Sequence, residues 1–70
     1  MTDFTLDDHG RIILMRPETL AALHWIQENL MDGATWVAGS IVIDRNFLDE
    51  ILIDLFRDDL TWATPTPTLH

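Results

Sequence analysis

A helical segment predicted over residues 47–59 constrains the fold most, because it is apolar around most of its circumference. At about 100° per residue, an arc about 180° wide collects the larger part of its apolar side chains. They are Phe47, Leu48, Ile51, Leu52, Leu55 and Phe56. Ile53 lies outside this arc, and Leu60 joins it if the helix extends that far, which widens the apolar surface to about 240°. A surface helix needs little more than about 100°, so this one requires two apolar neighbours: its own sheet, and either the first helix or another subunit.

The size of the chain makes that requirement harder to meet. Its 70 residues form a single domain, and so short a chain buries only about 60% of its unfolded surface. The absence of cysteine excludes disulfides and thiolate zinc sites, and His9, His24 and His70 are not spaced as metal ligands. We therefore predict no cofactor and no metal, and we expect a partner chain to supply the missing stabilisation.

The charge of the chain restricts its partners. The net charge is −8, from 12 acidic residues against four basic ones, all of them arginine. The absence of lysine excludes Schiff-base catalysis and a lysine-based phosphate cradle. An acidic surface repels nucleic acid, so we predict no direct nucleic-acid binding, whereas a basic protein partner is favoured. The alternative is that the charge only keeps the protein soluble.

The distribution of apolar residues is that of a globular protein. Apolar residues make up 47% of the chain, and no apolar run approaches the roughly 20 residues that a membrane span needs. Residues 1–4 show neither the basic region nor the apolar stretch of a signal peptide. We therefore predict a cytoplasmic protein with no membrane partner.

Alternating and β-branched segments predict a small sheet. Residues 2–15 are expected to form a β-hairpin around a turn at 7–10, and residues 35–43 a third strand that is apolar on both faces. Trp36 is then expected in the core, with packing at the edge of the sheet as the alternative. Residues 61–64 could add a short edge strand. The predicted fold class is α+β: a single-layer sheet, hairpin plus third strand, packed by two helices in the order ββαβα. Residues 1–64 form one compact acidic domain, and residues 65–70, with two prolines, an extended or disordered tail.

The first helix is predicted over residues 17–31, with Pro17 at its first position and Gly33 as its cap. Its expected core face holds Leu20, Leu23, Ile26, Leu30 and Met31, with Ala22 at the edge. Trp25 then lies on the opposite, polar face. Either a second layer such as the tail or the hairpin covers this indole, or Trp25 is a contact residue in an interface, where tryptophan is enriched.

The second helix also carries an acidic strip. Asp44 or Asn46 caps its start, and residues 44–59 hold six acids and two arginines. The strip consists of Glu50, Asp54 and Asp58, with Arg57 beside them. Such a strip could imitate a phosphate backbone toward a nucleic-acid-binding protein, or it could be a solvated face.

Two short motifs are explained without catalysis. Asp7, Asp8, His9 and Gly10 place two carboxylates beside an imidazole, but adjacent residues of a tight turn diverge instead of converging in a cleft. Residues 44–46 start like a calcium loop, yet the glycine expected at its sixth position is replaced by Asp49. Because the sequence shows no nucleophile with an activator, we predict that the protein is not an enzyme.

These patterns predict a protein-binding module that self-associates as a homodimer through the second helix and Trp25. The predicted partner-binding residues are Trp25, Ile53, Leu60, Glu50, Asp54 and Asp58. The alternative is a small acidic inhibitor or antagonist, similar in size and charge to antitoxins, immunity proteins or viral anti-defence proteins. It would bind a larger, basic, nucleic-acid-binding host protein, with nucleic-acid mimicry as one route.

Overall fold

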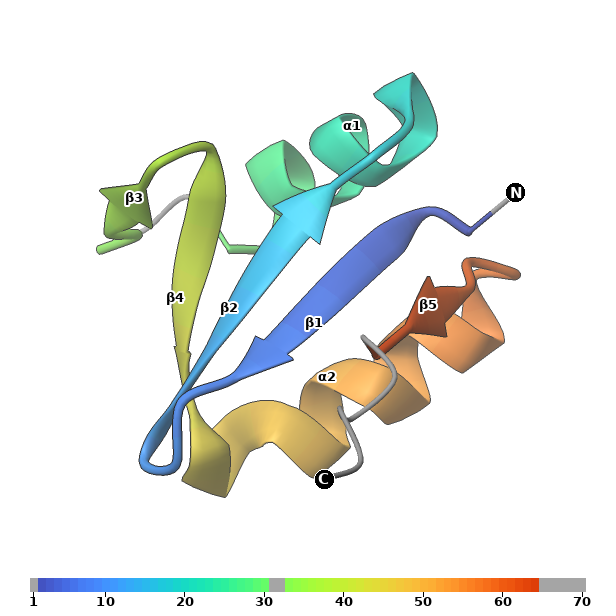
Figure 1. Ribbon diagram of the computed structural model, residues 1–70. Coiled ribbons are helices and arrows are strands. Elements are labelled where there is room, and N and C mark those ends of the chain that lie inside the picture. The colour runs from blue at the N-terminus through green and yellow to red at the C-terminus, as the bar shows by residue number, and fades with distance from the viewer. Residues whose placement is uncertain (1, 31–32, 65–70) are drawn as a thin grey trace, which may run out of the picture.

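The computed structural model describes residues 2–30 and 33–64, and within them the predicted α+β class is confirmed (Figure 1). The elements in chain order are β1 (Phe4–Asp8), β2 (Ile12–Pro17), α1 (Leu20–Asn29), β3 (Trp36–Val37), β4 (Ser40–Asp44), α2 (Arg45–Arg57) and β5 (Trp62–Ala63). The predicted tail at residues 65–70, and Met31 of the predicted first-helix core, lie outside the described residues.

The strands form one sheet in the order β3-β4-β2-β1-β5 (Figure 1). The β1–β2 hairpin and the β2–β4 pair are antiparallel. The predicted edge strand is present: β5 pairs in parallel with β1 at the edge of the sheet, with Trp62 opposite Phe4. After α2, the chain therefore returns to the sheet beside Phe4, at the start of β1.

The core lies on one face of the sheet. Because side chains alternate along a strand, the register of Leu6 with Met15, and of Ile13 with Ile43, puts the buried strand residues on the same face. They form a single cluster with the buried residues of both helices. Its members are Phe4, Leu6, Ile13, Met15, Ala22, Trp25, Ile26, Ile41, Ile43, Ile51 and Leu55. Both helices therefore pack on this face.

The segment predicted as one third strand is a hairpin of two. Ala38 and Gly39 both have positive φ, 50° and 83°, as the type I′ turn of a two-residue hairpin requires. The reversal leaves β3 as a short edge strand, and Trp36 is 40% exposed instead of lying in the core. The prediction failed because alanine is not a typical residue for a left-handed conformation, so Gly39 was the one local signal of a turn.

The first helix begins later than predicted. Pro17 is the last residue of β2. Proline lacks the backbone N–H donor, and this is tolerated at the end of a strand. Thr19 is the N-cap, and its Oγ1 accepts a hydrogen bond from the Ala22 amide at 3.1 Å. The buried face consists of Ala22, Trp25 and Ile26, and the predicted core residue Leu20 is 69% exposed. Since α1 is packed on a face rotated from the expected one, Trp25 points inward.

The second helix starts at Asp44, one of the two predicted caps, and ends in a tight turn after Arg57, two residues earlier than predicted. Asp44 is the N-cap and accepts a hydrogen bond from the Asn46 amide at 2.8 Å. Asp59 has φ 59°, and the amide of Leu60 donates to the carbonyl of Leu55 at 2.9 Å. This bond pattern is a Schellman-type C-cap, with aspartate where glycine is usual. The cap turns Leu60 out of the helix and toward the core, where it is half-buried.

Asp3 joins the start of α1 to the exit from α2. Its carboxylate accepts hydrogen bonds from Thr19 Oγ1 at 2.8 Å and from the Thr61 amide at 3.0 Å. The Thr61 amide, and then the Thr19 hydroxyl, hold the pKa of Asp3 below its usual value. This carboxylate therefore holds the start of α1 to Thr61, which lies 58 residues from Asp3 along the chain.

Candidate protein-interaction surface

The two helices meet at Trp25, which is buried rather than available to a partner. Its side chain is only 6% exposed. The ring lies edge-on to Phe4, with centroids 6.1 Å apart, and Nε1 donates a hydrogen bond to Asp58 Oδ2 at 2.7 Å. An indole has a large apolar body and one polar donor. Here Phe4 of β1 packs against the body, and Asp58 at the end of α2 accepts the hydrogen bond. The prediction that Trp25 is a partner contact is therefore wrong, and Asp58 is committed within the chain.

The exposed apolar surface of α2 is larger than the sequence indicated, and it is placed differently. Ile53 is 53% exposed, as expected for a residue outside the core arc, but Phe56 is 75% exposed. Phe47 is exposed as well. Both phenylalanines were predicted in the core arc. The sheet covers only the side of α2 around Ile51 and Leu55, so the outer parts of a 180° arc remain uncovered.

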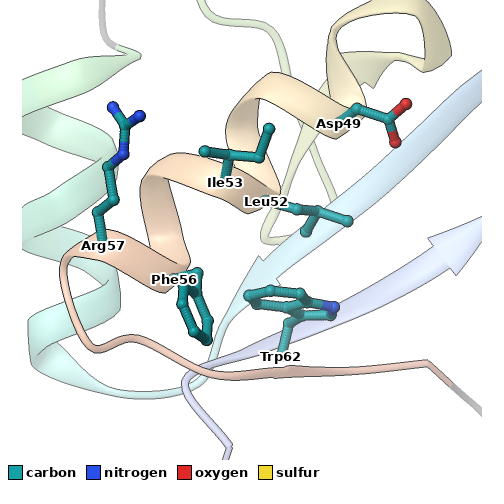
Figure 2. Close-up of a pocket in the computed structure, with 6 residues that line it drawn as sticks. All are labelled: Asp49, Leu52, Ile53, Phe56, Arg57 and Trp62. Atoms are coloured by element: carbon teal, nitrogen blue, oxygen red, sulfur yellow. The ribbon is translucent and has the colours of Figure 1, made fainter.

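Trp62 turns part of this surface into a groove. The groove has a volume of about 660 Å³ and is lined by Leu52, Ile53, Phe56 and Trp62, with Asp49 and Arg57 at its rim. Figure 2 shows Trp62 of β5 facing the flank of α2 that carries Leu52 and Phe56. The pairing of β5 with β1 holds this tryptophan in place. We call the concavity and its six lining residues the α2 groove.

Leu60 lies next to the α2 groove instead of extending the exposed stripe. Together with Phe56, Thr61 and Trp62 it lines a smaller hollow of about 190 Å³. The sequence could not indicate that Trp62 would stand beside Phe56, because the two are brought together by the C-cap turn and by the β5–β1 pairing. Trp62 and Phe56 are thus the residues of the candidate surface that the sequence pattern did not indicate.

The acidic strip lies on the other side of α2 from the apolar part of the groove, and Arg57 lies between the two. At about 100° per residue, the centre of Glu50, Asp54 and Asp58 lies roughly 150° around α2 from the centre of Leu52, Ile53 and Phe56. Glu50 and Asp54 are exposed. Among the described residues, neither takes part in an ion pair. The predicted partner-binding residues therefore separate into a helix–helix contact, an apolar groove and an acidic flank.

The face of the sheet opposite the helices offers a second apolar area. Ile12 and Val37 are exposed there, and Leu14 and Val42 are half-buried. Asp7, which pairs with Leu14, and Arg16, two residues beyond Leu14 in β2, place charges on the same face. The α2 groove is the stronger candidate, because it is concave and holds two aromatic side chains, the residue class enriched in the centres of interfaces.

The carboxylates and imidazole near the β1–β2 turn are used in local contacts. His9 Nε2 lies 3.0 Å from Asp7 Oδ2. Asp8 pairs with Arg45, and this guanidinium holds the pKa of Asp8 below its usual value. Arg45 also donates to the carbonyl of Gly10. These contacts fasten the turn to the start of α2.

Within residues 2–30 and 33–64, no group of three His, Asp or Glu side chains is placed to hold a metal ion. Neither helix of this part of the chain has the length and apolar character needed to cross a membrane. Comparisons with protein-family models, curated proteins and solved structures found no match to the chain. Evidence about function therefore comes from the surface itself.

Proposed function

We propose that this protein is a non-enzymatic protein-binding module that self-associates as a homodimer through the α2 groove. The observation that carries the proposal is the 75% exposure of Phe56 next to Trp62 and Ile53. Exposed aromatic side chains around a concavity are typical of the anchor residues of interfaces. Isolated exposed apolar residues need no explanation, but here several gather on one flank of one helix.

The energetic argument favours an apolar partner surface. Fully burying a large apolar side chain stabilises a complex by about 1.5–3 kcal/mol. A homodimer buries Phe56 and Ile53 twice. The free energy gained from these four side chains offsets a large part of the cost of association, which is about 4–15 kcal/mol. A second copy of the chain supplies a matching apolar surface without the need for any other protein.

Solution mass tests this proposal. Sedimentation equilibrium or light scattering at micromolar concentrations is expected to report about twice the chain mass. Ile53→Asp places a charge in the groove and is expected to yield a folded monomer, because Ile53 is not part of the core. The matched control is Leu20→Asp, which changes an exposed apolar residue of α1 and leaves the dimer intact. A wild-type protein that stays monomeric into the high micromolar range contradicts the proposal.

A second function is favoured by the acidic flank. Glu50 and Asp54 are exposed on the side of α2 away from the groove, and the chain has a net charge of −8. We propose, as the alternative, an acidic antagonist that binds a basic, nucleic-acid-binding protein through this flank. Capture of an identified protein of that class, lost at high salt and in Glu50→Gln/Asp54→Asn but retained in Ile53→Asp, would support it. Capture that is insensitive to salt would count against it.

A further inference from the structure

Two opposite charges stand at equal distances on either side of Ile53 along the rim of the α2 groove. Asp49, Ile53 and Arg57 follow one another at four-residue spacing, which keeps them on the same side of a helix. Each charged residue is about 6 Å of helix rise from Ile53. Figure 2 shows Asp49 toward one end of the helical stretch and Arg57 at the other, with Ile53 between them.

Neither charge is neutralised within the described part of the chain. The ion pairs found there join Asp7 with His9 and Asp8 with Arg45. Arg57 is the one basic residue of α2 besides Arg45, and Arg45 is already paired at the opposite end of the helix. An acidic rim and a basic rim around one apolar groove are therefore left to interact with something outside the chain.

Resting on the proposed self-association, we propose that the occupant of the groove is a second copy bound through an antiparallel, two-fold symmetric pairing of the α2 helices centred near Ile53. A two-fold axis makes an interface self-complementary: if one residue contacts another, the reverse contact also forms. Asp49 then faces Arg57 of the partner subunit, and Arg57 faces the partner subunit's Asp49. The interface gains two ion pairs around an apolar centre.

The same symmetry brings the apolar flanks together. An axis perpendicular to the plane of the two helices keeps the flank carrying Phe56 and Trp62 on the same side of the helix pair in both copies. The two grooves then join across the helix pair, and each Phe56 is buried against the partner subunit. Asp54 of the acidic flank stays on the other side of the helix pair, in contact with solvent.

The charges also select the direction of the helices. A parallel two-fold pairing sets Asp49 against Asp49 and Arg57 against Arg57, and like charges brought together across an interface cost several kcal/mol. Two chains that each carry −8 repel one another at long range. A local attraction between Asp49 and Arg57 offsets this repulsion only in the antiparallel arrangement.

Charge reversal tests the pairing. Asp49→Arg gives a rim with two basic residues and Arg57→Asp a rim with two acidic ones, so each homodimer sets like charges together twice. We expect each variant to weaken self-association by at least about tenfold, from the size of coupling energies between close charge pairs across interfaces. The double variant Asp49→Arg/Arg57→Asp restores opposite charges. Its dissociation constant is expected within about threefold of the wild-type value, a difference consistent with imperfect additivity. An equimolar mixture of the two single variants is expected to form the heterodimer.

The matched control is Glu28→Arg, which makes the same change of net charge at an exposed position of α1. Both Asp49→Arg and Glu28→Arg lower the overall repulsion between copies. Weakened association in Asp49→Arg but not in Glu28→Arg therefore identifies a local contact. Dissociation constants from sedimentation velocity, with circular dichroism to verify folding, are the measurements.

The outcomes separate this inference from the function on which it rests. A monomeric wild type overturns both. A wild-type dimer that Ile53→Asp dissociates, but that both single charge reversals leave unchanged, preserves the proposed function and overturns the antiparallel pairing. Loss of association in both single variants without recovery in the double variant also overturns the pairing, because opposite charges would then have been restored without effect.

Discussion

The two helices each carry a large aromatic residue, and the structure treats the two differently. The burial of each differs from the prediction: Trp25 of α1 was expected outside the core face and Phe56 of α2 within the core arc. Trp25 of α1 is buried with its indole donor bonded to Asp58, whereas Phe56 of α2 remains the most exposed of the large apolar side chains in the described residues. Around Trp25, β1 and the end of α2 both contact the ring. Phe56 has Trp62 on one side only.

The difference shows that burial depends on which elements reach a side chain, and not on its apolar character. The same contrast holds between neighbours in one helix: Leu55 is fully buried against the sheet, and the next residue is exposed. Substitutions on either side of this boundary should change the free energy of unfolding of the monomer by very different amounts, and they test where the boundary lies.

The largest effect is expected for Leu55→Ala. A fully buried leucine replaced by alanine loses apolar burial and leaves a cavity, at a cost of about 2–5 kcal/mol. Small domains have a total stability of only about 5–15 kcal/mol, so the midpoint of urea denaturation should fall markedly. Leu52→Ala, at a half-buried position of the same helix, should cost clearly less. Equal losses in the two variants would show that the core boundary on α2 is misplaced.

Trp25→Phe is expected to have the next largest effect. It removes the hydrogen bond to Asp58 and part of the ring that packs on Phe4, and we expect a loss of about 1–2 kcal/mol. A double-mutant cycle with Asp58→Ala isolates the contribution of the bond. If the losses of the two single variants simply add, the indole and the carboxylate are not coupled.

Asp3→Asn is expected to have a smaller effect that depends on pH. The pKa of Asp3 is lowered in the folded state, so its ionised form adds stability at neutral pH, and this contribution disappears as the pH falls below the ordinary aspartate value of about 3.9. Because solvent screens this carboxylate, the difference at pH 7 should stay below about 1 kcal/mol. Thermal unfolding at pH 7 and pH 3 measures it. A difference between variant and wild type that widens on acidification would contradict the linkage.

Phe56→Ser is expected to change the stability of the monomer least, by no more than about 0.5 kcal/mol, as for most surface substitutions. Unfolding should be followed at low protein concentration, where mass action does not add the free energy of association. The same variant should weaken self-association strongly, because it removes the aromatic rim of the groove. A large loss of monomer stability would mean that Phe56 belongs to the core after all.

Much of the fold could be predicted because its signals are local. The β1–β2 hairpin, the Asp44 cap and the edge strand at Trp62 follow from alternation, from side-chain capping and from β-propensity within a few residues. The start of α1 was misplaced because Pro17 suits a strand end as well as a first helical turn, and Thr19 supplied the stronger cap. Of the candidate surface, Ile53 could be identified from the helical wheel alone.

The rest could not be predicted, because it depends on residues far apart in the chain. The partner of Trp25 lies 33 residues away, and Asp3 contacts Thr61 across 58 residues. No periodicity reports such a contact. The direction in which Leu60 and Trp62 turn after α2 was also undetermined, because it depends on a left-handed aspartate that local preference does not select.

By itself, the sequence determined an acidic chain without cysteine or lysine, its α+β class, and a second helix with more apolar surface than one sheet covers. Only the tertiary structure decided which apolar residues that surplus comprises. A sheet covers one side of a helix, so it buries Ile51 and Leu55 and leaves Ile53 and Phe56. The pairing of β5 with β1 then sets Trp62 beside them and makes a groove from what would otherwise be a convex helix surface.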